Sequence, residues 1–321
     1  MGLAAVGVFL ASILIGRYPQ PFWMPLQVLR DDPLASQLVL KLRLPRLITA
    51  LMLGMVLAAS GTVMQMIFRN PLVEPGFLGV SQGAAFGAAV SILWLGRHPL
   101  LIELSATFFS LLALAGAYFL STRIRYGGWV LRLILSGVAV SALFSAGVGV
   151  LKYIADPLTE LPELTFWMLG GLYRVTWRDL LFALPFALLG IGTAYAMRWR
   201  LNLLSLNDQT AFSLGASLGR ERLILLLITV SATAALTAIS GIIGWIGLII
   251  PHISRRIFGA SAEKSLPGAM LLGGIFSMLS DDLARTVFPG EIPLGILTSA
   301  IGAVLFIYLM ISMGIKVRSH E

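Results

Sequence analysis

The sequence predicts an all-α protein that crosses a membrane about ten times and forms a single domain over residues 1–321. Of its 321 residues, 58% are hydrophobic and only 12% are charged, and the mean hydropathy is +0.90. Soluble domains carry roughly a quarter charged residues. Because one crossing takes about 20 residues, helices and short loops use up the whole length. We therefore expect no soluble domain of ordinary size.

Apolar runs bounded by Arg, Pro, Gly or Asp mark the individual spans. The expected spans are 2–16, 47–68, 77–96, 99–121, 130–154, 178–197, 223–240, 242–258, 266–284 and 292–315. As a helix the first run covers roughly 22 Å, which is less than the roughly 30 Å of a hydrocarbon core. It has the length of a signal peptide, but no Lys or Arg precedes it. We therefore expect it to be the first helix.

The charges lie between the apolar runs. The net charge is +8, and the basic residues fall in the connections. This pattern indicates loops that face an anionic lipid bilayer rather than a nucleic-acid-binding surface. With both termini in the cytoplasm, the cytoplasmic loops hold only a small excess of Lys and Arg, so the outer basic residues need a separate explanation. The absence of cysteine excludes disulfides and thiolate chemistry.

Two Gly/Pro-interrupted stretches suggest an inverted repeat. Residues 69–76 and 288–295 each place a Glu between prolines, then a Gly and a helix of small residues. Each lies downstream of a Leu-Pro pair that opens a span, at residues 44–45 and 266–267, and the two copies have opposite expected orientations. Corresponding broken segments in two halves are typical of inverted-repeat transporters. The alternative to a repeat is that these Gly and Pro residues simply end or interrupt helices.

The spans lack groups that could supply energy or chemistry. No Asp, Glu, Lys or Arg lies near the middle of an expected span, although ion-driven carriers usually keep one there. The phosphate loop G-x-x-x-x-G-K-[ST] is absent, so any ATP must be bound by a second protein. No histidine pair has metal-ligand spacing, and we expect His252 to pack or to bond to backbone. The residues therefore favour neither a catalytic nor a metal site.

Two segments are candidates for contact with cargo or partners. In the fifth span small residues recur every four positions, on one helix face that either lines a pathway or subunit contact or packs against a neighbouring helix. These are Gly137, Ser141, Ser145 and Gly149. Residues 202–222 contain a short helix capped by Asn207 or Asp208 and ended by Gly215. Its apolar residues suit either docking to a cytoplasmic partner or an interfacial position on the bilayer.

Several long motifs in order resemble the FecCD-type permeases, the membrane subunits of ATP-binding-cassette importers for vitamin B12, haem and iron–siderophores. The matching positions are 43–46, 54, 60–61, 65, 69–72, 74–76, 78–81, 83–84, 241–255, 266–267, 281–285 and 291–298. Within them, the residues expected to have structural roles are Asn70, Pro71, Glu74, Pro75, Pro251, His252, Glu291 and Pro293.

The resemblance implies a type II importer permease of ten helices that works as a homodimer in the cell's inner (plasma) membrane. It implies two cytoplasmic ATPase subunits that bind ATP and magnesium, an external binding protein that delivers cargo, and no cofactor or catalysis on this chain. The expected cargo is a metal chelate, namely a ferric siderophore, haem or cobalamin. An oxyanion such as molybdate, an ion-gradient-driven carrier and an intramembrane enzyme are the alternatives.

The resemblance also implies residue roles. In family members that carry vitamin B12, arginines matching Arg43, Arg46 and Arg285 face outward and meet glutamates of the binding protein. An internal pair with Asp281 or Asp282 is the competing role for Arg285. Segment 202–222 corresponds to the family's coupling helices, with Asn207 and Asp208 in place of the usual Gly and Glu. The expected ATPase contacts are Asn207, Asp208, Ala211, Phe212, Leu214, Gly215 and Arg220, and the expected pathway adds Gly79, Ser81 and Gly83 to the small-residue face.

Overall fold

The computed structural model describes the backbone of residues 1–288 and 290–318, and side chains as far as residue 311. The α-helices are α1 (Gly2–Leu14), α2 (Leu26–Asp31), α3 (Pro33–Leu38), α4 (Leu44–Phe68), α5 (Val80–Val90), α6 (Pro99–Arg123), α7 (Trp129–Ile154), α8 (Glu160–Leu169), α9 (Trp177–Ala196), α10 (Arg198–Leu204), α11 (Asp208–Ser213), α12 (Leu218–Ser240), α13 (Ile246–Phe258), α14 (Ala262–Thr286) and α15 (Leu294–Arg318). Two π-helical turns, η1 (Val39–Arg43) and η3 (Ser91–Leu95), and the 3₁₀ turn η2 (Pro75–Leu78) extend or connect them. Strands β1 (Ile15–Gly16) and β2 (Phe22–Trp23) pair antiparallel, with Ile15 opposite Trp23.

Each expected span contains a helix, but the count of ten crossings stays a prediction. Within the described residues, six helices are long and apolar enough to cross a membrane by length and composition. They cover residues 33–68, 99–123, 129–154, 177–196, 218–240 and 294–311. Helix α1 and the apolar helix over 80–95 are shorter. The chain is therefore a multi-pass helical protein, and the number of crossings depends on the short helices and on α14, which is long but is not among these six.

Helix boundaries follow from local sequence. Prolines fall in the first turns of α3, η2 and α6, where the missing N–H costs no hydrogen bond. Pro45, in contrast, lies directly after the π-helical turn η1 within one continuous helical stretch over Pro33–Phe68. Helix α12 ends at Gly241, and the next helix begins only at Ile246, because Gly241 and Trp245 both have positive φ angles. Helix α8 was not expected from the sequence.

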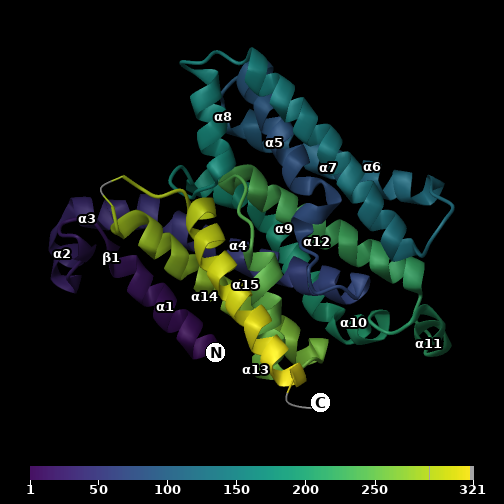
Figure 1. Ribbon diagram of the computed structural model, residues 1–321. Coiled ribbons are helices and arrows are strands. Elements are labelled where there is room, and N and C mark those ends of the chain that lie inside the picture. Colours follow the sequence, from purple (N-terminus) through teal and green to yellow (C-terminus); the bar gives the residue numbers. More distant parts are fainter. Residues whose placement is uncertain (289, 319–321) are drawn as a thin grey trace.

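Helix α4 forms the centre of the molecule. It packs against α14, α13, α12 and α9, while α5 packs against α6 and α7 (Figure 1). A Cβ atom added to Gly54 would lie 2.0 Å from the carbonyl oxygen of Gly273, so α4 and α14 touch backbone to backbone. Small residues at such crossings are typical of helix packing in membranes.

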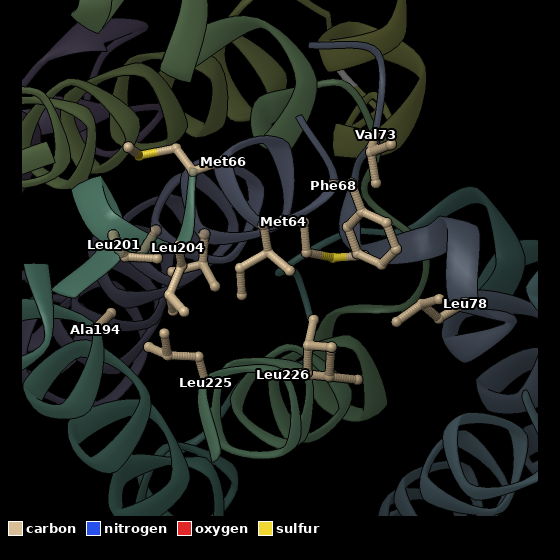
Figure 2. Close-up of a cluster of buried hydrophobic side chains, with 14 of the residues drawn as sticks. Met64, Met66, Phe68, Val73, Leu78, Ala194, Leu201, Leu204, Leu225 and Leu226 are labelled. Carbon is tan, nitrogen blue, oxygen red and sulfur yellow. The ribbon is translucent and has the colours of Figure 1, made fainter. Parts of the chain in front are cut away.

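One large apolar cluster packs around the C-terminal half of α4. Figure 2 shows Met64 of α4 in the middle of this cluster, with Leu201 and Leu204 of α10 on one side and Phe68, Val73 and Leu78 on the other. A second cluster surrounds the N-terminal half of the same helix, and includes Leu47 and Leu53. Burial along its whole length therefore makes α4 a rigid axis between the two ends of the protein.

The two broken stretches lie at opposite ends of α4, as the inverted-repeat hypothesis expects. Arg69 follows the last residue of α4 and pairs with α11, whereas Glu291 pairs with Arg46 in the first turn of α4. The start of α1, the end of α15, α10 and α11 lie at one end of the molecule, and α2, α3 and the start of α8 lie at the other (Figure 1). These are called the inner and outer ends below. Residue 289 of the second stretch lies outside the described residues.

Candidate functional site

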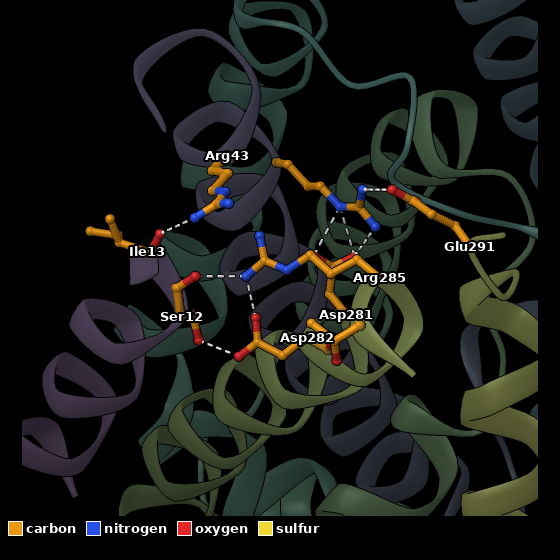
Figure 3. A network of polar contacts seen from close by, with 9 residues as sticks. Ser12, Ile13, Arg43, Asp281, Asp282, Arg285 and Glu291 are labelled. Atoms are coloured by element: carbon orange, nitrogen blue, oxygen red, sulfur yellow. Dashed lines mark hydrogen bonds and ion pairs between the residues drawn. The ribbon is translucent and has the colours of Figure 1, made fainter. Parts of the chain in front are cut away.

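Arg46 is held inside the outer end of the molecule. Its Nη2 lies 2.9 Å from Oδ1 of Asp281, and its Nη1 lies 2.9 Å from Oε1 of Glu291 (Figure 3). The Arg46 side chain is 11% exposed and that of Asp281 is fully buried. These contacts join α4, α14 and the segment before α15. The motif residue Glu291 thus has a defined structural partner.

Arg285 also has an internal partner. It forms an ion pair with Asp282, one turn earlier on α14, and its Nη2 donates to the Ser12 carbonyl at 2.7 Å. The Ser12 hydroxyl donates to the other oxygen of Asp282 at 2.5 Å. The internal pair considered for Arg285 is therefore formed, and its partner is Asp282.

Arg43 and Arg17 lie beside this network without a carboxylate partner among the described residues. Arg43 donates to the carbonyls of Ile13 and Tyr18, at 3.0 and 3.2 Å, and Arg17 donates to the carbonyl of Thr286. Both arginines line an outer cavity of about 360 Å³ together with Arg46 and Arg285. The sequence placed Arg17 on the outer side, directly after the first apolar run, but gave no reason to include it among the docking residues. The role of the arginines in docking remains a prediction.

The small residues expected on the pathway divide into two groups. Ser81 and Ser141 line a cavity of about 380 Å³ with Gln82 and Thr237, and Ser145 is exposed on α7. Gly149 is also exposed, and a Cβ added to it would meet nothing within 4 Å. The others pack against neighbouring segments: Gly137 against the Phe77 carbonyl, Gly83 against the Phe109 carbonyl, and Gly79, with φ +85°, against Val140.

Glu74 lies between two cavities. It lines the cavity of about 380 Å³ and a second one of about 510 Å³ that also contains Trp245, Gly295 and Ser299. Glu74 is the only ionisable residue among the described residues that line either cavity. The sequence identified Glu74 as a structural motif residue, and the structure adds that it lines two cavities.

The remaining motif residues shape turns and helices. Asn70 Oδ1 accepts from the Leu72 N–H at 2.9 Å across Pro71, and Pro75 opens η2. Pro251 lies inside α13, and the Pro293 carbonyl accepts from Ile296 in the first turn of α15. His252 Nδ1 lies 3.1 Å from the Leu248 carbonyl, so this histidine is bonded to backbone as expected.

Helix α11 presents an apolar surface at the inner end. Asn207 is its N-cap, because its Oδ1 accepts from the Thr210 N–H at 2.8 Å. Ala211 is buried, whereas Phe212 is 76% and Leu214 is 56% exposed. Gly215, with φ +82°, ends the segment, and Arg220 is exposed at the start of α12. The helix therefore offers two large apolar side chains to a partner.

Asp208 turns back toward its own chain. Its Oδ1 lies 3.0 Å from Nη2 of Arg69 and 2.8 Å from Nη2 of Arg222. The hydrogen bond from Arg222 holds the pKa of the Asp208 carboxyl below its ordinary value, and the nearby charges of Arg222 and Arg69 act in the same direction. Sequence reasoning missed both partners, because no local signal links a residue of α11 to positions 69 and 222.

Comparison with known proteins identifies the family of this chain. The family described as the FecCD transport family matches residues 4–312 of this chain. The chain belongs to the FecCD transport family. Its FecCD relatives include the molybdate import system permease protein of Haemophilus influenzae, which is 40% identical over 302 residues, covering 94% of this chain and 89% of that protein. The hemin transport system permease protein of Yersinia pestis is 41% identical over 281 residues, covering 85% of this chain and 82% of that protein.

A solved structure agrees with this assignment. The inward-facing conformation of a metal-chelate type ABC transporter superimposes with a TM-score of 0.89, at 40% identity, covering 97% of each chain. This FecCD chain is therefore a permease component of an ABC importer, and ATP is hydrolysed by a separate subunit. ATPase and binding-protein partners follow from membership of the family.

Proposed function

We propose that two copies of this chain form the translocation pathway of an importer for a metal chelate in the cell's inner (plasma) membrane. The cargo class is a ferric siderophore, haem or cobalamin, delivered by an external binding protein. Similarity to a hemin permease and to a metal-chelate type transporter supports this class.

The surface of α7 carries the proposal. Its apolar window is only 28% buried within the chain, and so is that of α15. The exposed part of α7 places Ser145 and Gly149 beside large apolar residues such as Leu143 and Val150. A second copy packed there would cover the apolar residues, and the small polar stripe would line a pathway. Small residues and hydroxyls offer few strong contacts, which suits a pathway that must release its cargo.

The inner and outer ends of the molecule suit different partners. At the inner end, Phe212 and Leu214 of α11 are exposed and are assigned here to contact with the ATPase, together with Arg220. ATP and magnesium are bound by that ATPase, and this chain needs no cofactor of its own. At the outer end, the cavity lined by four arginines complements acidic side chains of a binding protein.

Molybdate is the second candidate cargo, because the Haemophilus influenzae relative is named for molybdate import and is similar over 94% of this chain. The deciding experiment is uptake by proteoliposomes that contain this chain, its co-encoded ATPase and its co-encoded binding protein. Uptake of radioactive iron chelate, haem or cobalamin, unaffected by excess molybdate, supports the chelate proposal. Saturable molybdate uptake that the chelates do not inhibit overturns it in favour of the oxyanion.

A gradient-driven carrier is tested in the same vesicles. ATP-dependent uptake that survives a protonophore and a sodium ionophore supports the importer. Uptake that needs an ion gradient and no ATP would instead show a secondary carrier. The expected spans have no ionisable residue near their middle, which favours the first result, and Glu74 beside the two cavities is the residue that a gradient-driven carrier would use.

A further inference from the structure

The carboxylate of Asp208 joins three segments at the inner end. It is the first residue of α11, and it contacts Arg69 at the end of α4 and Arg222 in the first turns of α12. Both arginines approach the same oxygen, at 3.0 and 2.8 Å. One side chain on the exposed helix is therefore tied to two points of the membrane-embedded core.

The two arginines are held very differently. The Arg222 side chain is 5% exposed, and its guanidinium lies 5.1 Å from the ring centre of Trp129 at the start of α7. Trp129 in turn stacks on Phe68, with ring centres 5.9 Å apart. Arg69 is 38% exposed, so its pair with Asp208 is the more solvated one. The Arg222 contact thus anchors Asp208, and the Arg69 contact connects this anchored carboxylate to the end of α4.

Arg69 lies where the chain leaves α4 for the candidate pathway. It has a left-handed backbone, with φ +50°, and ends the long helix. The segment after it reaches η2, where the Phe77 carbonyl packs on Gly137 of α7. Glu74 and Ser81 of the same region line the cavity of about 380 Å³. A displacement of Arg69 therefore acts at one end of a short segment whose other end forms the cavity wall.

We propose that the Asp208–Arg69 ion pair transmits movement of α11 to the pathway segment 69–79, with Asp208 as the positioning residue. This inference rests on the proposed function, in which α11 contacts the ATPase. In this proposal the Asp208 carboxylate contacts residues of the permease itself. The apolar side chains of Phe212 and Leu214 contact the ATPase instead. The pair couples ATPase movement to the pathway, whereas the apolar residues provide attachment.

The test measures cargo transported per ATP hydrolysed in proteoliposomes of the whole transporter. Arg69→Gln breaks the proposed link and leaves the Asp208–Arg222 anchor in place, and Asp208→Asn weakens both contacts. Loss of one solvated ion pair predicts a decrease of about two- to fivefold in cargo per ATP for Arg69→Gln. The double variant should be no worse than Asp208→Asn alone, because both changes remove the same link. Arg69→Lys should restore most of the ratio.

Lys264→Gln is the matched control, since Lys264 is exposed at the inner end of α14 and has no ion pair among the described residues. It should leave the ratio unchanged, and the ATPase should co-purify with every variant. An unchanged ratio in Arg69→Gln, or fully additive losses in the double variant, overturns the proposal. If Asp208→Asn fails to fold, Arg69→Gln and Arg69→Lys decide alone. Failure of wild type to bind an ATPase or to show ATP-dependent uptake would contradict the proposed function itself.

Discussion

The guanidinium of Arg46 lies 3.0 Å from the buried carboxylate of Asp281, a residue 235 positions further along the chain. This pair fastens the first turn of α4 to the last turns of α14, at the outer end of the backbone contact between Gly54 and Gly273. The family resemblance implies that Arg46 docks the binding protein. In this structure the same side chain also joins α4 to α14, so Arg46 would have both roles.

Asp281→Ala should destabilise the protein strongly. Removal of one partner leaves Arg46 buried with only Glu291 to balance it, and such losses cost about 3–5 kcal/mol. Thermal unfolding in detergent measures the effect. The double variant Arg46→Met/Asp281→Leu should recover much of the stability, because no buried charge is left without a partner. An Asp281→Ala protein as stable as wild type would contradict this role.

The outer arginines should separate into two functional groups. Among the described residues, Arg17 and Arg43 donate hydrogen bonds to backbone carbonyls and form no ion pair. Arg17→Gln and Arg43→Gln should therefore lower affinity for the binding protein about five- to tenfold, with a weaker salt dependence. Arg46→Gln should mainly lower thermal stability. Arg30→Gln, an exposed change on α2, is the control. Surface-immobilised binding protein measures affinity, and equal losses for Arg17, Arg43 and Arg30 would contradict a localised docking site.

Adding a methyl group should lower stability at Gly54 of α4 but not at Gly149 of α7. Gly54→Ala places a Cβ against the Gly273 backbone, where neither helix can yield easily, and should cost about 1–3 kcal/mol or prevent assembly. Gly149→Ala has open space around it and should leave stability unchanged. Size-exclusion chromatography after heating compares the two. A stable Gly54→Ala protein would show that α4 and α14 are not in backbone contact.

Glu103 is expected to be replaceable. Its side chain is 5% exposed, one oxygen has no hydrogen-bond partner, and the 3.6 Å contact with Arg178 is shared with Asp179. Glu103→Gln keeps the shape and removes a buried carboxylate, so thermal stability should stay equal or rise by about 1 kcal/mol. A clear decrease would indicate that the charge of Glu103 is needed, and Asp179→Asn would then show whether the two carboxylates act together.

The Asp208 link should be insensitive to pH in the physiological range. The pKa of this carboxyl is lowered in the folded protein, chiefly by its hydrogen bond from Arg222. Its stabilising contribution is thus present above the unfolded pKa of about 3.9 and is lost only as the pH falls through the lower folded value. Asp208 should therefore contribute no pH dependence to the cargo transported per ATP between about pH 6 and pH 8, so wild type and Asp208→Asn should have pH profiles of the same shape there. A decline within this range that Asp208→Asn abolishes would contradict the assignment.

Hydropathy and helix signals predicted the positions of the long helices, because apolar runs and proline starts are local properties. They missed α8, whose sequence contains two acidic residues and Pro162 within ten residues. The start of α13 was misplaced by four residues, since only the backbone reveals the positive φ angle of Trp245. The sequence also predicted that Asn207 or Asp208 caps the short helix, and Asn207 is the N-cap of α11.

Charge pairing in the site was not foreseeable to the same degree. Motif resemblance gathered Arg43, Arg46 and Arg285 at one end, and helix spacing indicated the pair of Arg285 with Asp282. The carboxylate partner of Arg46 lies 235 positions away, and the partners of Arg43 are backbone carbonyls, so neither could be read from local sequence. The same limit hid the contact of Asp208 with Arg69, 139 positions earlier. Which chain segments meet across the membrane depends on helix packing, and the sequence pattern specifies that packing only through small residues such as Gly54.

The importer assignment is tested most directly by ATP hydrolysis of the reconstituted complex of this chain and its partner ATPase, with and without the binding protein. We expect the ATPase to co-purify through α11 and the binding protein to stimulate hydrolysis. Arg17→Gln/Arg43→Gln should remove most of this stimulation and leave basal hydrolysis unchanged. If no ATPase associates with the chain, or if the binding protein has no effect on hydrolysis by the wild-type complex, the importer assignment of this site is contradicted.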